Sequence, residues 1–160
     1  MTNERDLAVY VLLRTDLPSM NPGKAAAQVH HAGVQMVNKH RAQALVRDYI
    51  TQGMEQGADN FNTTIVLGAT LEQIQHVSAQ ANQLNHNVVV LDTVTDPSYP
   101  FFVENAEVAD LIPESTARAI KKMPDGRILM VREEVTCAWF VGDRNDPQFR
   151  ALFDGLDLHA

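Results

Sequence analysis

The chain has 160 residues and a mass of 17.8 kDa, a length that fits one compact domain burying roughly two-thirds of its unfolded surface. Hydrophobic residues make up 45% of the chain and charged residues 21%, which excludes a disordered or fibrous protein. The net charge of −7 is unevenly divided, because the first 50 residues carry +2 and the remainder −9. A local basic surface on an acidic body therefore leaves room for a nucleic-acid partner.

Cysteine usage and hydropathy limit where the protein acts. The single cysteine, Cys137, excludes an internal disulfide framework and a cysteine-based zinc site, and it favours a reducing compartment. The apolar run near the start is too short to cross a bilayer, and no other stretch reaches about 18 apolar residues. We therefore expect a cytoplasmic protein with neither a signal peptide nor a membrane span.

The first part of the chain predicts a strand followed by two helices. Residues 7–13 form a short apolar run rich in β-formers, typical of a buried strand. After a proline-containing loop, Asn21 can cap a helix that has Pro22 as its first residue and runs to about Lys39. A second helix is expected over residues 42–54, closed by Gly53, Gly57 and Asn60.

The middle of the chain predicts a strand, a helix and a strand. Residues 63–67 form the first strand, and Thr70 with Gln73 makes a capping box before an amphipathic helix that extends to about Leu84. Residues 88–91 lack alternation, as expected for a strand covered on both faces. A unit of this length implies a parallel strand pair with a right-handed crossover.

The last third of the chain is less regular. Two prolines and small polar residues predict a loop over residues 92–100. Short helices are expected at 107–112 and 115–122, strands at 127–131 and 136–141, and a final short helix at 148–152.

A narrow polar stripe on the first helix is the leading candidate site. At 100° per residue, Lys24, Gln28, His31 and Gln35 share a sector roughly 60° wide. Such stripes are commonly solvated surface, but this one begins at a helix N-terminus, which favours anions, and directly follows a strand end.

The third strand is expected to end in a carboxylate, Asp92, followed by the hydroxyls of Thr93 and Thr95. If the first and third strands are parallel neighbours, Asp92 and Asp16 lie at the same rim as Lys24 and His31. A lysine there keeps an aspartate ionised, and histidine titrates near neutrality. The alternative is a plain Asx-type turn at residues 92–97.

Metal and thiol chemistry receive little support from the sequence. His30 and His31 are adjacent on a helix and point about 100° apart, which makes a poor metal pair. Cys137 lies in an apolar strand and is interpreted as a core residue.

Residues 8–33 combine the segment Tyr10-Val-Leu-Leu-Arg-Thr-Asp-Leu17 with Met20, then Gly23-Lys24-Ala-Ala-Ala-Gln28 and His31-Ala32. This combination of residue types and spacing resembles the type 2 peptidyl-tRNA hydrolase family. The order of elements from Thr63 to Asp92, and the segment from Val135 to Leu158, are also similar to that family. The resemblance implies a mixed four-stranded sheet with helices on both faces, often as a dimer. It also implies hydrolysis of the ester between a peptide and tRNA, without a metal or other cofactor.

Two departures separate this chain from the family pattern. After the equivalent aspartate the family usually has Asp-x-Gly-x-Thr, whereas this chain has Asp92-Thr-Val-Thr95-Asp96-Pro97. The chain also inserts about 30 residues, from Phe101 to Glu134, where the family is short. The insert has no assigned role, and a lid, a subunit contact and simple core packing all stay open.

These observations predict a single α/β domain over residues 1–160, with a mixed sheet of about four strands, helices on both faces and an insert at 101–134. The expected function is hydrolysis of peptidyl-tRNA in the cytoplasm, with a possible homodimer and no membrane partner. The expected catalytic residues are Lys24, Gln28, His31, Asp92 and Thr95, and the expected substrate-binding residues are Arg14, Asp16, Gln35 and Lys39.

Each catalytic residue has an expected role. Lys24 engages the terminal phosphate or the oxyanion, and Gln28 orients the ester or the water. Asp92 or His31 acts as general base, and Thr95 positions the water. One alternative is a non-catalytic homologue that binds RNA, a nucleotide or a protein through the same rim. Another is an enzyme for a different small molecule.

Overall fold

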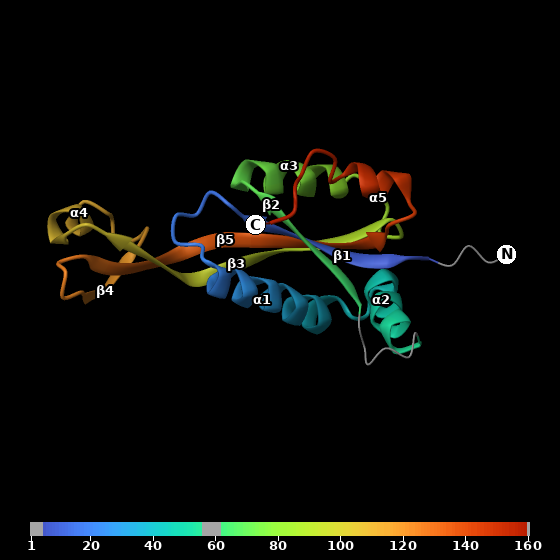
Figure 1. The fold of residues 1–160 in the computed structure, drawn as a ribbon, viewed down its shortest axis with the longest axis horizontal. Helices are drawn as coiled ribbons and strands as arrows, with labels where there is room; N and C mark the ends of the chain where they lie inside the picture. Colours follow the sequence, from blue (N-terminus) through green and yellow to red (C-terminus); the bar gives the residue numbers. More distant parts are fainter. Residues whose placement is uncertain (1–4, 56–61, 160) are drawn as a thin grey trace.

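The computed structural model describes residues 5–55 and 62–159. In chain order the elements are β1 (Leu7–Arg14), α1 (Pro22–His40), α2 (Ala44–Glu55), β2 (Thr63–Ala69), α3 (Leu71–Ala81), β3 (Val89–Val103), α4 (Ala106–Asp110), β4 (Arg118–Lys122), β5 (Ile128–Asp143) and α5 (Pro147–Ala151). The strands form one mixed sheet in the order β2-β1-β5-β3, and β4 pairs with the first residues of β5. α1 and α2 cover one face of the sheet and α3 and α5 the other (Figure 1). The predicted α/β architecture is confirmed, with five strands rather than about four.

The two central strands carry most of the core. β1 is buried along almost its whole length, and β5 is buried from Thr136 to Gly142. Side chains of β5 alternate between the two faces, so Trp139 packs beneath α1 and α2 while Phe140 packs with Phe149 of α5 on the other side. Both tryptophan and phenylalanine rings are fully buried, which explains why these strands show continuous apolar runs in the sequence.

The predicted helix starts are confirmed in detail. The side chain of Asn21 accepts a hydrogen bond from the backbone N–H of Lys24 at 3.0 Å, and Pro22 begins α1. Thr70 and Gln73 form both bonds of a capping box at the start of α3. Among the described residues, no helix is long and apolar enough to cross a lipid bilayer.

The predicted loop over residues 92–100 is wrong, because β3 continues through it to Val103. Pro97 and Pro100 misled the prediction, since proline is excluded from central strands but tolerated at a sheet edge, and β3 is an edge strand. The pairing with β5 shifts register between Asp96 and Tyr99, where a β-bulge accommodates Pro97, and Pro100 pairs with Val131 beyond the bulge. Residues expected in a loop are therefore held in the sheet.

The predicted pairing of the second and third strands is also wrong. β2 and β3 run in the same direction, but they occupy opposite edges of the sheet, and β2 pairs in parallel with β1. β5 lies between β1 and β3 and is antiparallel to both. The connection through α3 therefore crosses from one edge of the sheet to the other. As a result, the neighbour of β1 on that side is β5 and not β3.

The last third of the chain differs from its prediction in three places. Residues 115–122, expected as a helix, contain the strand β4, and the strands expected at 127–131 and 136–141 are one continuous strand, β5. α2 continues past Gly53 to Glu55, and the expected turn residues Gly57 and Asn60 lie outside the described residues. The short helices α4 and α5 lie close to their predicted positions.

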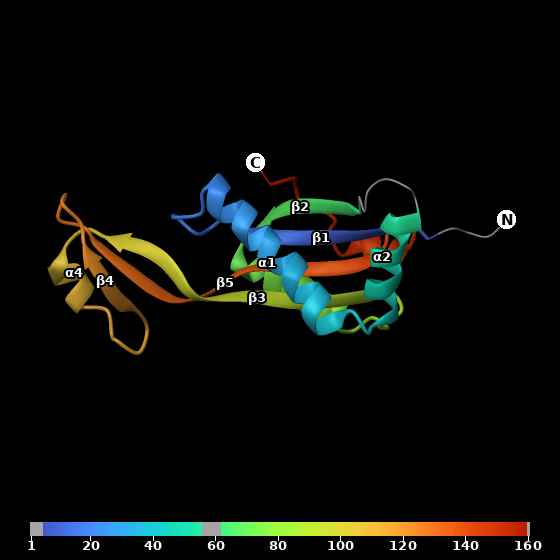
Figure 2. The same cartoon turned by 90° about the horizontal axis from the view of Figure 1, so that it is seen from below.

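Beyond the body of the sheet, β3 and β5 continue together and form an extension that we call the arm (residues 99–132). The arm projects from the body and carries α4 and β4 at its far end (Figures 1 and 2). Its own small core consists of Ala109, Ala117, Ile128 and Met130, with Phe101, Val103 and Ile112 packed against it. The predicted insert at 101–134 corresponds closely to this arm.

Candidate active site at the bulge of β3

The polar stripe of α1 faces β3, rather than solvent, along much of its length. Lys24 Nζ donates to the carbonyl oxygen of Pro100 at 3.1 Å, Gln28 Nε2 to Asp96 Oδ2 at 3.0 Å, and Gln35 Nε2 to the carbonyl oxygen of Thr93 at 3.0 Å. The order of these bonds shows that α1 runs antiparallel to β3. The helix therefore brings its N-terminal half to the bulge.

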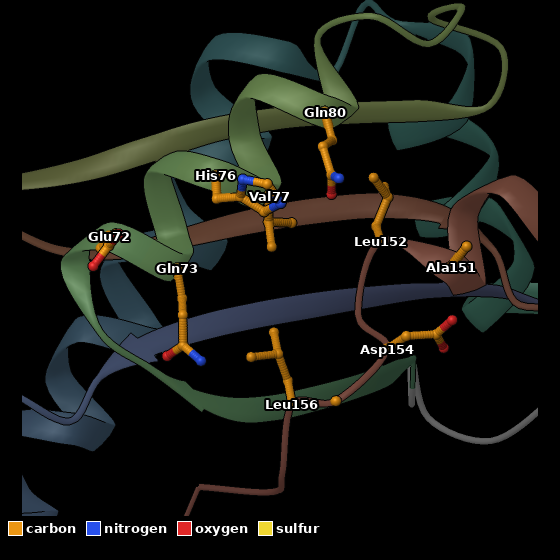
Figure 3. A pocket seen from close by; sticks show the side chains of 10 residues that line it. Glu72, Gln73, His76, Val77, Gln80, Ala151, Leu152, Asp154 and Leu156 are labelled. Carbon is orange, nitrogen blue, oxygen red and sulfur yellow. The ribbon is translucent and has the colours of Figure 1, made fainter.

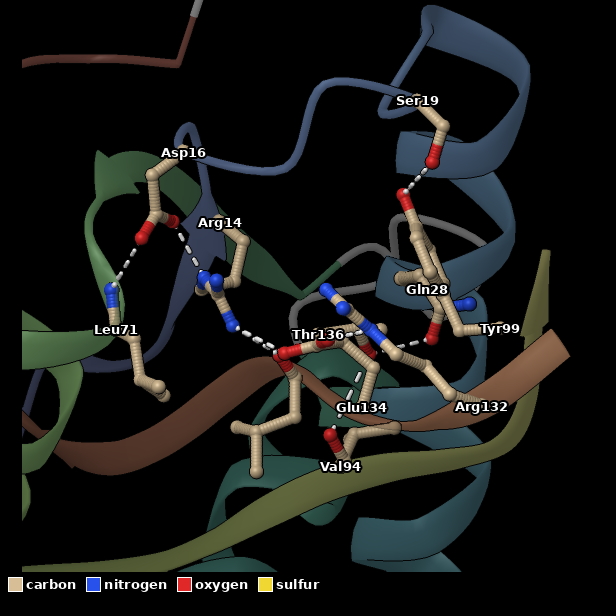
Figure 4. A network of polar contacts seen from close by, with 11 residues as sticks. Arg14, Asp16, Ser19, Gln28, Leu71, Val94, Tyr99, Arg132, Glu134 and Thr136 are labelled. Atoms are coloured by element: carbon tan, nitrogen blue, oxygen red, sulfur yellow. Dashed lines mark hydrogen bonds and ion pairs between the residues drawn. The ribbon is translucent and has the colours of Figure 1, made fainter. Parts of the chain in front are cut away.

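Gln28 and Asp96 form the centre of the candidate site. Gln28 is only 4% exposed, and its amide oxygen accepts a hydrogen bond from the fully buried hydroxyl of Thr136 at 2.7 Å (Figure 4). This bond, together with the carboxylate, fixes which end of the amide points toward Asp96. The other carboxylate oxygen of Asp96 accepts from the backbone N–H of Ser98 at 2.9 Å. Asp96 is thus held in place from two sides.

Lys24 lies close to this carboxylate in a partly desolvated position. Its ammonium is 4.9 Å from the centroid of the buried Tyr99 ring, whose hydroxyl accepts a hydrogen bond from Ser19 at 3.0 Å. Burial lowers the pKa of Lys24, and the negative charge of Asp96 partly opposes that effect. An ammonium has three N–H donors, and the bond to Pro100 uses one of them. Lys24 therefore keeps donors for an anionic or carbonyl oxygen.

A shallow cavity of about 240 Å³ opens beside the central carboxylate. Its lining residues are His31, Val34, Gln35, Val94, Thr95, Asp96 and Pro97. The structure therefore brings four of the expected catalytic residues, Lys24, Gln28, His31 and Thr95, around one carboxylate. That carboxylate is Asp96.

Asp92 does not lie beside Lys24 as expected. It accepts a hydrogen bond from His40 Nε2 at 2.9 Å and lies 3.7 Å from the ammonium of Lys39, both at the C-terminal end of α1. Lys24 and His40 are about 24 Å apart along the helix axis at 1.5 Å per residue. The prediction is wrong because β3 does not end at Asp92. The carboxylate that lies beside Gln28 is Asp96, four residues later in the strand.

The expected substrate-binding residue Arg14 is enclosed in an ion-pair network instead (Figure 4). Its guanidinium, 6% exposed as a side chain, bonds Asp16, Glu134 Oε1 at 2.9 Å and the carbonyl oxygen of Val135 at 2.8 Å. Burial by itself lowers the pKa of Arg14, but the two carboxylates outweigh it and raise that pKa above its ordinary value. Burial by itself raises the pKa of Asp16, but the hydrogen bonds that Asp16 accepts from Arg14 and from the Leu71 N–H outweigh it and lower that pKa.

The other two expected substrate-binding residues also have structural partners. Gln35 accepts from the indole N–H of Trp139 at 2.8 Å while donating to β3, so both ends of its amide are used. Lys39 pairs with Asp92 near the exposed end of α1. These residues hold α1 on the sheet and lie at or beyond the margin of the candidate site.

Sequence reasoning missed Asp96, Thr136 and Tyr99 as members of the site. For Asp96 a signal was present, because it is the second carboxylate of the segment that follows the third strand. Thr136 and Tyr99 gave none, since their positions depend on the pairing of β3 with β5.

Metal and thiol chemistry find no support at this place. Within residues 5–55 and 62–159, no group of three histidine, cysteine or acidic side chains is arranged to hold a metal ion. The thiol of Cys137 is fully buried, and desolvation raises its pKa to about 12.

A separate cavity of about 430 Å³ lies on the opposite face, between α3 and the C-terminal segment (Figure 3). It is lined by Gln73, His76 and Asp154 among others, and it contains none of the predicted site residues. The candidate site is therefore the one at the bulge of β3.

Comparison with known proteins identifies a family that the chain resembles over its first part. The family model described as peptidyl-tRNA hydrolase PTH2 matches residues 7–99, more than half of the chain. The matched segment contains α1 and the bulge with Asp96, and it ends where the arm begins. A search of curated proteins found no match.

Proposed function

The chain belongs to the peptidyl-tRNA hydrolase PTH2 family, and we propose that it hydrolyses the ester between a peptide and the 3′-terminal ribose of tRNA. The observation that carries the proposal is the convergence of Lys24, Gln28, His31 and Thr95 on Asp96 beside an open cavity. These groups supply a base, an oxyanion donor and polar side chains that can orient a water, which ester hydrolysis requires.

In the proposed reaction, the ester carbonyl occupies the cavity and a water lies between it and Asp96. The carboxylate of Asp96 takes a proton from the water as the water oxygen bonds to the carbonyl carbon, and the hydroxyl of Thr95 holds the water. The ammonium of Lys24 stabilises the oxyanion that forms. Collapse of the intermediate breaks the bond to the ribose oxygen, which receives the proton from Asp96, so the products are a free peptide and tRNA.

In this proposal Gln28 positions the base rather than touching the ester. Its amide N–H donates to Asp96, and the buried hydroxyl of Thr136 holds the other end of the amide. The second oxygen of Asp96 is held by the Ser98 N–H, so the carboxylate has a fixed orientation toward the cavity. A fixed base avoids reorganisation when the proton moves.

Asp96 and Asp92 carry the same functional group at different places along β3, so the same substitution at each gives a matched test of the general base. With labelled peptidyl-tRNA as substrate, we expect Asp96→Asn to lower kcat about 100-fold or more, while Asp92→Asn keeps near wild-type kcat. Lys24→Ala is expected to lower kcat about 100-fold through loss of oxyanion stabilisation. Wild-type rates in Asp96→Asn, or a collapse confined to Asp92→Asn, would contradict the proposed roles.

Replacement of each side chain distinguishes Asp96 from His31 as the general base. If Asp96 is the base, His31→Gln keeps kcat within a few fold of wild type, while Asp96→Asn loses about 100-fold or more. A loss of that size in His31→Gln, with Asp96→Asn close to wild type, would instead make His31 the base. The same measurements would reveal a non-catalytic homologue, which would bind tRNA in a salt-dependent manner without releasing peptide.

Two expectations about cellular context belong to the same proposal. A peptidyl-tRNA hydrolase acts where translation occurs, so we propose a cytoplasmic location, which fractionation of cells expressing the tagged protein would test. The homodimer that the resemblance implies stays a prediction, and light scattering on the purified protein would measure its mass.

A further inference from the structure

The arm has one face that is left exposed. Across its three strands, residues that pair directly point to the same side, and two such rows are Pro100–Val131–Arg118 and Phe102–Leu129–Lys121. Phe102 is 45% exposed, and Arg118 and Lys121 are also exposed. This exposed arm face, defined by these two rows, combines apolar and aromatic surface with cations.

The opposite face of the arm is packed and leaves the exposed arm face without a structural role. Met130 lies between the two rows and Ile128 just beyond the second row; they are 2% and 7% exposed and pack in the arm core. The arm can therefore fold around that core alone. Phe102 is not needed to fill it.

Positive charge is concentrated on the strand that borders the exposed arm face. Three of the five residues of β4 are cationic, namely Arg118, Lys121 and Lys122, and every residue of β4 is exposed. The guanidinium of Arg127 lies 4.8 Å from the centroid of the Phe102 ring and is held by Asp125 at 2.7 Å. On a chain with a net charge of −7, such a cluster is a local feature that attracts anions.

The exposed arm face begins at the candidate active site. Pro100, the first residue of the first row, accepts the hydrogen bond from Lys24. Phe102 follows two residues later, about 7 Å farther along the strand. A ligand whose reactive end lies at Lys24 and Asp96 can therefore continue directly onto the arm.

We propose that the exposed arm face binds the unpaired 3′-terminal nucleotides of the tRNA, with Phe102 stacking on a base and Arg118 and Lys121 contacting phosphates. This inference rests on the proposed function, because the nucleotides next to the scissile ester must leave the site along some surface. Exposed aromatic rings flanked by arginine and lysine are the features that bind single-stranded nucleic acid. The family match does not include this surface, since the match ends at residue 99.

A protein strand is the less favoured occupant of this face. Lysine residues and bulges on an edge strand oppose pairing with another strand. β4 has both features, because Lys121 and Lys122 lie on it and its register shifts between Ala119 and Lys121. The charge and the interrupted edge favour a polyanion that contacts side chains.

The test compares two substrates and three variants, of which two change the arm and one is a control. One substrate is labelled peptidyl-tRNA, and the other is an N-acetylaminoacyl ester of adenosine, which retains the scissile bond but lacks the rest of the tRNA. The arm variants are Arg118→Ala/Lys121→Ala and Phe102→Leu, which keeps apolar bulk. The matched control, Arg47→Ala/Arg150→Ala, removes two exposed cations from α2 and α5, which lie at the far end of the body (Figure 1).

We expect each arm variant to raise KM for peptidyl-tRNA about fivefold or more without changing kcat, and to leave kcat/KM for the adenosine ester unchanged. The double arm variant should also lower the slope of log KM against log salt concentration by about 1.4, because each lost phosphate contact removes roughly 0.7 from that slope. The control variant should match wild type with both substrates.

The inference and the proposed function fail differently. If wild type hydrolyses both substrates and the arm variants keep its KM and salt dependence, the exposed arm face does not bind tRNA and the inference is overturned. If wild type hydrolyses neither substrate, the proposed function fails. In that case, weaker binding of uncharged tRNA by the arm variants would still support the surface, and unchanged binding would refute it.

Discussion

Replacing Arg14 with methionine tests whether this buried arginine supports the fold or binds substrate. Arg14 is the cation at the end of β1, and the sequence alone favours a role in substrate binding. In the structure its guanidinium is enclosed and bonds Asp16, Glu134 and a backbone carbonyl. Methionine keeps similar length and apolar stem but removes every one of these bonds.

The expected loss of stability follows from what each partner retains. Breaking a buried ion pair by removing one member costs about 3–5 kcal/mol. Glu134 is 12% exposed but keeps Arg132 at 2.7 Å, and Asp16 is 38% exposed and keeps the Leu71 N–H. These partners place Arg14→Met at the lower end, about 3 kcal/mol. For a domain of this size that corresponds to a Tm lowered by about 6–12 °C.

Calorimetry and urea unfolding measure this loss, and Arg127→Met serves as the control. Arg127 pairs with Asp125 at 2.7 Å, but both side chains are about half exposed, so its removal should cost less than about 1 kcal/mol. Well below the lowered Tm, Arg14→Met should retain wild-type KM for peptidyl-tRNA. A stability within about 1 kcal/mol of wild type together with a raised KM would refute the structural role and restore the role in substrate binding.

Three further predictions concern single residues. Because Cys137 is buried with a pKa of about 12, a thiol reagent such as Ellman's should fail to react in the native state and should titrate one thiol in denaturant; rapid native reaction would contradict the burial. The pKa of Asp16 is lowered on folding, so its contribution to stability is present above its unfolded pKa of about 3.8 and is lost as pH falls through the lower folded value. Urea unfolding against pH should therefore show a shallower acid decline in Asp16→Asn, and identical profiles would refute this. A Cβ on Gly142 would overlap the buried Phe149 ring, so Gly142→Ala should cost about 1–3 kcal/mol, whereas Gly33→Ala on the exposed side of α1 should stabilise by about 0.5–1 kcal/mol. Thermal unfolding of both alanine variants would show equal Tm shifts if the predicted difference in packing is absent.

The sequence predicts this fold best where local signals decide. The capped start of α1 at Asn21 and the capping box at Thr70 follow from side chains within four residues of each other, and both are confirmed. The apolar runs of β1 and β5 reflect burial on both faces, which composition reveals directly. By contrast, a strand that contains Pro97 and Pro100 can be predicted only if β3 is known to lie at the edge of the sheet, and no local signal contains that information.

The candidate site shows the same limit. Lys24, Gln28 and His31 share one stripe by helix periodicity, so their proximity was predictable. The acidic partner was placed at Asp92 rather than Asp96, because the end of a strand was inferred from where the apolar run stops. The pairing of Gln28 with Thr136 joins residues 108 positions apart and depends on strand register.

The continuous pairing of β3 with β5 has a consequence for how the chain tolerates change in length. A hairpin can lengthen or shorten at its tip by paired residues while the register at its base stays the same. Phe101 and Met130 face each other near that base, so a short turn joining them would remove most of the projection while keeping Pro100, the partner of Lys24, and every rung of the central sheet in place. The outer region is thus a module that evolution or an engineer can exchange, while the chemistry at its root keeps its framework.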